Sequence, residues 1–182
     1  MSILTKGFSD EIEGYQVQTD FRLWLDFEKD LSSMNSPYDI IRLLKKYYRS
    51  KPDKNPIKAI SLLVSFYTGE EEESGAEGKA AGGRPSGYDY EVDAPLIYAA
   101  FLSQYGIDLT VAQLHWHSFL YLFRNLGEEQ KISKIIGYRT VDLDKIKEKE
   151  QKNMYRKLKQ MYRLPSTTVS DDTIGEVFSC MF

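Results

Sequence analysis

The sequence has one cysteine, two histidines and no long apolar run. Cys180 has no second cysteine with which to form an intramolecular disulfide or a cysteine-rich zinc site, so a reducing compartment suits the chain. No stretch approaches the roughly 18 apolar residues that a transmembrane helix needs, and the residues Met1–Lys6 lack the apolar core of a signal peptide. We therefore expect a soluble protein that stays in the cytoplasm.

An excess of charge of one sign is also missing. The 24 Lys and Arg residues and the 27 Asp and Glu residues give a formal net charge of −3, so the chain as a whole is not attracted to nucleic acid or to anionic lipid. Apolar mass, in contrast, is plentiful, because 42% of the 182 residues are hydrophobic and 13% are aromatic. That mass is enough to bury the core of one domain and argues against wholesale disorder.

Capping residues and apolar residues at helical spacing predict a mainly α-helical fold. Ser, Asp or Asn, each next to a proline or an apolar stripe, marks most helix starts. The segment Glu11–Val17 instead alternates polar and apolar side chains around Gly14, which predicts a short β-hairpin. The predicted helices run from Thr19 or Asp20 through Leu31, from Ser36-Pro37 to about Lys51-Pro52, from Asn55-Pro56 through Tyr67, from Asp93 to Gly106, from about Leu114 to Gly127, from Glu128 to Gly137, and from Asp142 to Arg163.

These elements together predict a single-domain helical bundle with a short N-terminal β-hairpin and a long basic C-terminal helix. We place this domain at residues 1–164. Residues 69–87 are rich in glycine and glutamate and poor in apolar side chains, which predicts a mobile acidic loop inserted in the domain. Residues 165–182 begin with a proline and are rich in Ser, Thr and Asp, so we expect a flexible C-terminal tail.

Charge is strongly segregated along the chain. Residues 139–163 hold nine basic and four acidic side chains, whereas residues 70–93 hold eight acidic and two basic ones. A basic helix interleaved with tyrosines can follow nucleic-acid phosphates, although a solvated helix face is the more common origin of such a pattern. The candidate phosphate-binding residues are Lys145, Lys149, Lys152, Arg156, Lys159 and Arg163.

The glycine-rich loop does not make a phosphate-binding P-loop. Gly78-Lys79 matches the end of that motif, but Glu73 stands where its first glycine belongs. Ala80 replaces the hydroxyl that binds magnesium. The glutamates beside the loop would also repel a phosphate, so we assign no nucleotide site.

The histidines and the cysteine do not assemble a catalytic or metal site either. His115 and His117 are two residues apart on the predicted helix, so we expect their rings to point about 200° apart and not to chelate one metal ion. Cys180 has no histidine base in its tail, and we expect an inert thiol. The sequence predicts a non-enzymatic protein that uses no cofactor and no metal.

The sequence contains the four runs Asp20-Phe21-Arg22, Tyr88–Leu109, Leu114–Phe119 and Ile132–Arg139. Together these runs resemble the bacteriophage gene-product-fifteen family of siphophages and prophages. The likeness covers roughly residues 10–164, and the runs are specific when taken together. His117 and Ser118 depart from it, since they stand where the family usually has Trp and Lys.

The resemblance implies a tail-module protein in the cytoplasm of the bacterial host. Long-tailed phages encode tail-assembly chaperones close to the gene for the tape-measure protein. Our leading hypothesis is therefore that the protein chaperones the tape-measure protein before tail-tube polymerisation, by holding its amphipathic helices in an aromatic groove. The candidate partner-binding residues are Tyr98, Phe101, Tyr105, Trp116, Phe119 and Phe123.

Two other functions stay open, because a stripe of aromatic residues at helical spacing is more often part of a core than of a binding surface. One is a nucleic-acid-binding or packaging accessory that uses the basic helix 142–163. The other is a minor structural protein of the virion. We expect the partners to be the tape-measure protein or other tail proteins. We expect no binding to a membrane, and nucleic acid is the weaker alternative as a partner. Self-association of the protein stays open.

Overall fold

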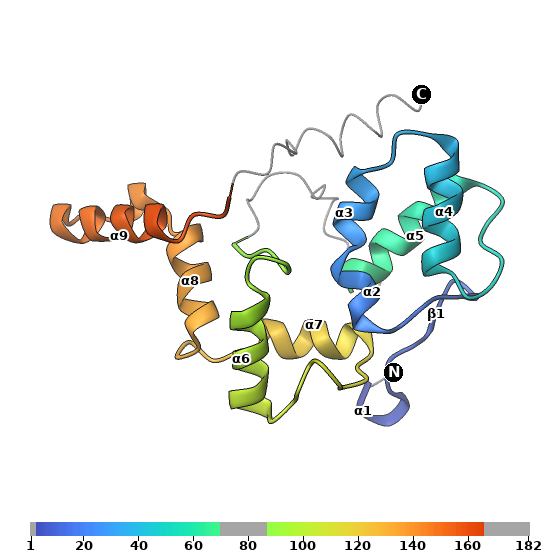
Figure 1. Cartoon of the computed structure of the whole chain (residues 1–182), viewed down its shortest axis with the longest axis horizontal. Helices are drawn as coiled ribbons and strands as arrows, with labels where there is room; N and C mark the ends of the chain where they lie inside the picture. The colour runs from blue at the N-terminus through green and yellow to red at the C-terminus, as the bar shows by residue number, and fades with distance from the viewer. Residues whose placement is uncertain (1–2, 70–86, 166–182) are drawn as a thin grey trace. The chain divides into compact units, whose positions relative to one another are not determined.

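A computed structural model describes residues 3–69 and 87–165 of the chain (Figure 1). In these ranges the chain is mainly helical with a small antiparallel hairpin near the N-terminus, which confirms the predicted α-helical class. The chain divides into two compact units, whose described parts are residues 3–69 with 113–121 and residues 87–112 with 122–165. The loop and the tail predicted at 69–87 and 165–182 fall almost entirely outside the described residues.

The first unit begins with α1 (Ile3–Lys6) and the predicted hairpin. The hairpin consists of β1 (Glu11–Ile12) and β2 (Tyr15–Gln16), in which Glu11 pairs with Gln16 and Ile12 with Tyr15. Gly14 lies in its turn at a φ of +80°, a left-handed conformation that a residue without a Cβ adopts at little cost. The sequence alternation around this glycine therefore gave the correct turn.

Local capping determines where the helices of the first unit begin. The side chains of Asp20, Ser36 and Asn55 accept hydrogen bonds from backbone N–H groups in the first turn of the helix that follows each. Such bonds satisfy donors that have no partner inside the helix. The starts predicted at Ser36 and Asn55 are thereby confirmed, and of the two caps predicted for the first helix, Thr19 and Asp20, the structure has Asp20. The helices are α2 (Phe21–Leu25), α3 (Phe27–Ser32), α4 (Pro37–Tyr47), α5 (Pro56–Thr68) and the first residues of α7 (Trp116–Arg124).

Two predicted helices of this unit were too long. The helix predicted from Asp20 through Leu31 is interrupted at Asp26, which ends α2 and precedes α3. Trp24 and Phe27, on either side of the interruption, are both buried with ring centroids 5.1 Å apart. The second predicted helix ends at Tyr47, because Tyr48 is extended and Val17 forms an isolated β-bridge with it.

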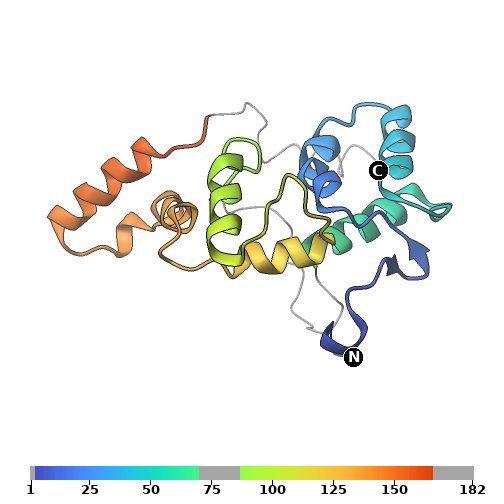
Figure 2. The same ribbon diagram turned by 60° about the horizontal axis from the view of Figure 1, so that its bottom comes forward.

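Aromatic rings fill the core of the first unit around Trp24. Its ring centroid lies 4.9 Å from Tyr47, 4.9 Å from Phe66 and 6.2 Å from Trp116. The indole Nε1 donates to the carbonyl of Gln18 at 2.8 Å, so the one polar atom of the ring is satisfied. Figures 1 and 2 show α4 and α5, which supply two of these rings, next to each other. This unit therefore has an aromatic core of its own.

The second unit is built around α8, which packs against two other helices. α6 packs against α8, and α8 packs against α9. Figures 1 and 2 show α9 beside α8, after the turn that contains η1. The most buried apolar side chains include Ile97, Phe101, Ile132 and Ile135. The elements are α6 (Ala94–Tyr105), the end of α7, α8 (Lys131–Thr140), the 3-10 helix η1 (Leu143–Lys145) and α9 (Lys149–Met161).

The long C-terminal helix was predicted with the wrong extent. Instead of one helix over 142–163, the chain forms η1 and then α9, whose 13 residues correspond to about 20 Å. Asp142 accepts a hydrogen bond from the backbone N–H of Asp144, and such local bonds compete with α-helical ones. Gly137, predicted as a stop, lies inside α8.

No helix within residues 3–69 and 87–165 combines the length and the apolar character needed to cross a membrane. Each of the two units buries its own set of side chains. That residues 1–164 form one domain stays a prediction.

Candidate partner-binding surfaces

Two of the six candidate aromatic residues lie in the core of the first unit. Trp116 is fully buried, its ring stacks 5.1 Å from that of Tyr67, and its Nε1 donates to the Tyr67 carbonyl at 2.9 Å. Phe119 is 1% exposed and stacks on Phe21 at 4.9 Å. These side chains stabilise the unit and are not accessible to a partner.

Two more candidates are buried in the second unit. Phe101 is fully buried, and its ring lies 5.7 Å from that of Tyr105. Phe123 is 7% exposed and meets Tyr88 edge to face at 4.8 Å. Burial of four of the six aromatics narrows the partner-binding hypothesis to Tyr98 and Tyr105, both of which are half-buried.

Tyr105 has a structural role at the end of α6. Its hydroxyl lies 2.9 Å from the carbonyl oxygen of Leu122 and 3.0 Å from that of Asn125. Burial raises the pKa of this phenol above its ordinary value, so the hydroxyl stays a donor. Gln104 adds two hydrogen bonds to the same connection, from its amide to the Asn125 carbonyl and from the Gly127 N–H to its own oxygen.

One side of α6 presents an apolar surface to solvent. No residue of Ala94–Tyr105 is charged. At about 100° per residue, the buried Ile97, Ala100 and Phe101 occupy one side of the helix. A helix that is apolar all round is normally covered all round. The opposite side stays open and is called here the open α6 face; it consists of Pro95, Tyr98, Ala99 and Leu102.

Leu102 is the member of this face that the sequence analysis missed. It is 44% exposed, a large fraction for a leucine in the middle of an uncharged helix. Its position four residues after Tyr98 places the two side chains next to each other on the helix surface. That spacing, together with the lack of charge, was the signal available in the sequence.

The six candidate basic residues do not form a continuous row of unpaired cations on the surface. Lys152 pairs with Asp144 at 3.1 Å, and Lys159 donates to the Val141 carbonyl at 3.0 Å. Both contacts tie α9 back to the segment that contains η1. Lys145 pairs weakly with Asp142 at 3.7 Å. Lys149, Arg156 and Arg163 are exposed.

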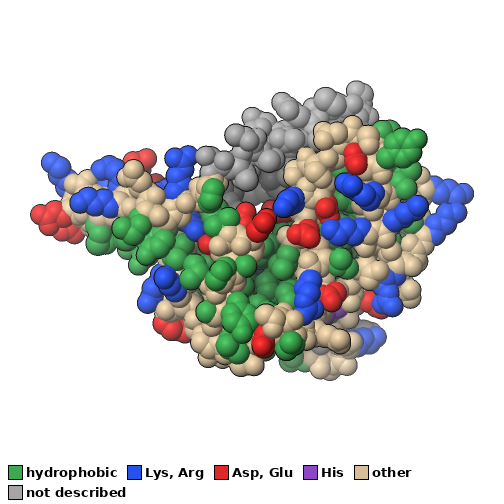
Figure 3. Space-filling model, viewed as in Figure 1, with side chains coloured by type: hydrophobic (Ala, Val, Ile, Leu, Met, Phe, Trp, Pro, Cys, Tyr) green, Lys and Arg blue, Asp and Glu red, His purple; other side chains and the backbone are tan. Residues whose placement is uncertain are grey.

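One side of α9 is basic and the other is apolar. Figure 3 shows Lys and Arg side chains along one side of the helix and hydrophobic side chains along the other. None of the residues of α9 is buried, and Met154 and Met161 are 49% and 71% exposed. Tyr155 and Tyr162 instead face α8, where their rings lie 6.2 and 5.9 Å from that of Tyr138.

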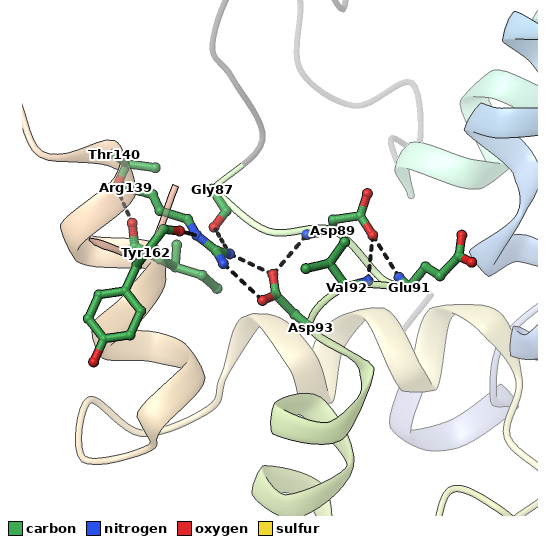
Figure 4. A network of polar contacts seen from close by, with 9 residues as sticks. Gly87, Asp89, Glu91, Val92, Asp93, Arg139, Thr140 and Tyr162 are labelled. Atoms are coloured by element: carbon green, nitrogen blue, oxygen red, sulfur yellow. Dashed lines mark hydrogen bonds and ion pairs between the residues drawn. The ribbon is translucent and has the colours of Figure 1, made fainter. Parts of the chain in front are cut away.

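A buried ion pair fixes the start of α6. Arg139 donates from both terminal nitrogens to the carboxylate of Asp93, at 2.6 and 3.0 Å (Figure 4). The same guanidinium donates to the carbonyls of Gly87, at 3.1 Å, and Tyr162, at 2.6 Å. The carboxylate also accepts the backbone N–H of Asp89 at 3.0 Å. The planar, five-donor geometry of arginine suits this role.

Local sequence patterns predicted another role for each member of that pair. Asp93 was predicted to cap α6, but its side chain makes no capping bond to the helix. Arg139 was counted with the basic segment, but its side chain is 11% exposed and adds no surface charge. The partners are 46 residues apart, and no local pattern joins them.

The predicted orientation of the two histidines was wrong. His115 precedes α7, and its Nδ1 accepts the backbone N–H of His117 at 3.1 Å. Its Nε2 therefore carries the proton and donates to the Ser9 carbonyl at 3.2 Å. The two imidazoles lie 5.1 Å apart and do not point in opposite directions. Burial, and then the neighbouring His117, lower the pKa of His115 from its ordinary value of 6.5.

Within residues 3–69 and 87–165, no group of three or more His, Cys, Asp or Glu side chains is arranged to hold a metal ion. Cys180 lies outside the described residues, so its predicted inertness stays a prediction.

Residues 7–164 match the model of a family described as Bacteriophage Gp15 protein. The match spans 158 residues (164 − 7 + 1) of 182, well over half of the chain. No curated protein and no solved structure matches the chain.

Proposed function

Because the chain belongs to the bacteriophage Gp15 family, we propose that it is a tail-assembly accessory protein that holds helices of the tape-measure protein until the tail tube polymerises. In this proposal the protein acts by binding, without catalysis, in the cytoplasm of the bacterial host. The observation that supports it is the open α6 face. An amphipathic helix presents apolar side chains at three- and four-residue spacing, which such a face can receive.

The chemistry of the open α6 face favours an apolar partner. Tyr98 and Leu102 stand next to each other on it, with Pro95 and Ala99 alongside. Complete burial of a tyrosine or leucine side chain on binding contributes roughly 1.5–3 kcal/mol of favourable free energy. Charged side chains, which would have to be desolvated, are absent from the whole of α6.

The open α6 face is also held rigid at both ends. Arg139 binds Asp93 at the start of α6, and the Tyr105 hydroxyl and Gln104 amide bind backbone carbonyls at its end. A surface that is ordered before binding loses less conformational entropy when the partner arrives. This rigidity supports a preformed docking surface for helices of varied sequence.

The rival function, nucleic-acid binding through the basic residues of 142–163, is less well supported. Lys152 and Lys159 already make contacts inside the chain. Phosphate binding also weakens steeply with salt, whereas binding through apolar side chains does not. Salt dependence therefore separates the two functions.

The test is to co-express a fragment of the tape-measure protein from the same phage with this protein. We expect the wild-type protein to keep the fragment soluble and to co-purify with it at both low and high salt. Leu102→Asp should abolish both effects. Val111→Asp is the matched control, because Val111 is 74% exposed in the same unit but lies outside α6. Equal rescue by the two variants would overturn the proposal.

A further inference from the structure

A strongly basic stretch of the first unit has no part in the proposed function. Residues 42–58 hold seven basic side chains and one acidic side chain, which gives 7 − 1 = +6, although the whole chain carries −3. The stretch covers the second half of α4, the connection that follows it and the start of α5. Figure 3 shows Lys and Arg side chains gathered over α4 and this connection, at the right of the view. The overall charge therefore conceals a local surface that attracts anions.

Part of this positive charge is neutralised inside the unit. The one acidic residue of the stretch, Asp53, accepts the Tyr15 hydroxyl at 2.9 Å and lies 3.9 Å from Lys58. Three of the seven basic side chains bind carboxylates from outside the stretch: Lys46 binds Asp30, Arg49 binds Asp10 at 3.7 Å, and Lys58 binds Glu13 at 2.9 Å.

Four basic side chains of the stretch stay exposed, namely Arg42, Lys45, Lys51 and Lys54. Arg42 lies 3.6 Å from Asp39 with its side chain 73% exposed, and such a pair is weak in water. For the three lysines, no carboxylate of residues 3–69 or 87–165 lies within 4.0 Å. An anionic partner can therefore bind all four cations without breaking a strong ion pair.

Tyr38 shares one side of α4 with two of these cations. At about 100° per residue, Tyr38, Arg42 and Lys45 fall within an arc of about 60°, and Ile41 lies at the edge of that arc. The buried residues of α4 occupy the opposite side of the helix. Tyr38 is 83% exposed, so α4 presents an aromatic ring to solvent on the same side as two positive charges.

The connection 48–55 holds Lys51 and Lys54 on an ordered backbone. The Arg49 N–H donates to the carbonyl of Gln16, in β2, at 2.9 Å, and Asp53 binds the same hairpin through its carboxylate. A surface whose backbone is ordered before binding loses less conformational entropy when a partner arrives.

The combination of an exposed ring with cations decides among the anionic partners. An acidic amphipathic helix needs an apolar stripe, whereas the only large apolar side chains that α4 exposes are Tyr38 and Ile41. A nucleic-acid duplex keeps its bases stacked inside and would leave the tyrosine ring without a partner. A single strand offers phosphates to the cations and unpaired bases to the ring, and it satisfies both features at once.

We infer that Tyr38, Arg42 and Lys45 of α4, with Lys51 and Lys54 of the connection, form a binding surface for single-stranded nucleic acid. The cations bind the phosphates, and a base stacks on the Tyr38 ring. This surface lies outside the basic segment 142–163, and the inference does not depend on the tape-measure assignment, because it rests on α4 and not on α6.

The experiment measures the binding of four labelled probes to the full chain by fluorescence anisotropy. The probes are a thymidine oligonucleotide of roughly 12 nucleotides, an abasic strand of the same length, a DNA duplex of that length and a glutamate peptide of similar charge. We expect the thymidine strand to bind about fivefold or more tightly than each of the other three, because it alone supplies both phosphates and unpaired bases.

Variants at Tyr38 test the stacking. Tyr38→Ala should weaken binding of the thymidine strand by about fivefold or more and leave the abasic strand unchanged, whereas Tyr38→Phe keeps a ring and should bind like the wild type. The thermal unfolding midpoints of both variants should match the wild type, since the side chain is exposed.

A double variant tests the phosphate contacts. Arg42→Gln with Lys45→Gln should reduce the slope of log K against log salt concentration by about 1.4, at roughly 0.7 for each phosphate contact on a single strand. The matched control is Lys131→Gln with Lys134→Gln, which removes the same charge from exposed positions on α8 and should leave the slope unchanged.

Four outcomes would overturn the inference. Equal binding of the abasic strand would mean that no base is stacked, and tighter binding of the duplex would mean that the surface reads double-stranded DNA. Equal binding of the glutamate peptide would point to an acidic protein as the partner. Equal effects of the α4 and α8 double variants would place the contacts elsewhere on the chain.

Discussion

Arg139 and Asp93 form a bidentate ion pair, with nitrogen to oxygen distances of 2.6 and 3.0 Å, that is buried inside the second unit. The same arginine also donates to the carbonyl of Gly87, in the segment that leads to α6, and to the carbonyl of Tyr162, which follows the last residue of α9. One side chain thus joins three segments that are far apart in sequence.

Loss of the carboxylate should destabilise the protein severely. Asp93→Asn leaves the Arg139 guanidinium buried without a countercharge, which typically costs about 3–5 kcal/mol. The measurement is the free energy of unfolding in urea. Asp144→Asn is the control, because it removes an ion pair whose carboxylate is 96% exposed and should cost less than about 1 kcal/mol. Similar losses in the two variants would show that the buried pair is not a main support of the unit.

Gly87 should not tolerate a side chain. A Cβ at this position would lie 2.6 Å from Cγ2 of Thr140 and 2.9 Å from Cγ2 of Ile136, too close for carbon atoms. We expect Gly87→Ala to lower the free energy of unfolding by about 1–3 kcal/mol, as overpacking does elsewhere. Denaturation curves of the variant and of the wild type give this difference in the free energy of unfolding.

Two further variants test the reason for that loss. Thr140→Ser removes one of the two crowded methyl groups and should recover part of the stability of Gly87→Ala. Gly137→Ala, inside α8 with nothing within 4 Å of the added Cβ, should instead stabilise the protein by about 0.5–1 kcal/mol. No recovery with serine would mean that the clash with Thr140 is not the cause.

Stability should fall in acid through His115. Its folded-state pKa is lowered from 6.5, so the unfolded state binds more protons as the pH falls. The contribution is therefore fully present above about pH 6.5 and is lost as the pH falls through the folded-state pKa. Protonation of Nδ1 also removes the acceptor for the His117 N–H.

The comparison is between the wild type and His115→Asn across this pH range. An asparagine side chain can accept the same N–H at a helix start but does not titrate. We expect the free energy of unfolding of the wild type to decrease more steeply below pH 6.5 than that of the variant. Parallel curves would rule out His115 as the titrating group.

The buried aromatics should matter for stability and not directly for binding. Phe119→Ala removes a ring that is 1% exposed and stacked on Phe21, and should cost about 3–5 kcal/mol. Tyr98→Ala, on the open α6 face, should change the free energy of unfolding by less than about 1 kcal/mol. Unfolding curves of the two variants check this division, and comparable losses would place Tyr98 in a core.

Local signals in the sequence predicted local structure well. The caps at Asp20, Ser36 and Asn55 and the turn at Gly14 each depend on neighbouring residues only, and the structure has all four. Periodic apolar residues likewise gave the α-helical class. Helix ends were less well predicted, as at Asp142, where a side chain bonds to its own backbone and interrupts the expected helix.

Contacts between distant residues could not be predicted in the same way. The sequence predicted Asp93 as a helix cap and Arg139 as part of a basic segment, because nothing in either neighbourhood indicates a partner 46 residues away. His115 was placed on a helix because the predicted helix begins at about Leu114, whereas α7 begins at Trp116 and the His115 ring binds the distant Ser9 carbonyl. The six aromatic candidates were identified by spacing alone, and spacing does not tell which face of a helix the rest of the protein covers.

The most direct test of tape-measure binding is the dissociation constant of a purified tape-measure fragment for the wild type and for Leu102→Asp, at low and at high salt. An aspartate on the open α6 face should weaken binding by about tenfold or more, since a charge would have to be desolvated in an apolar contact. The control Val111→Asp should bind like the wild type, and the wild-type constant should change little with salt. Binding that is unaffected by Leu102→Asp and lost at high salt would contradict the proposed apolar docking of the tape-measure protein on α6.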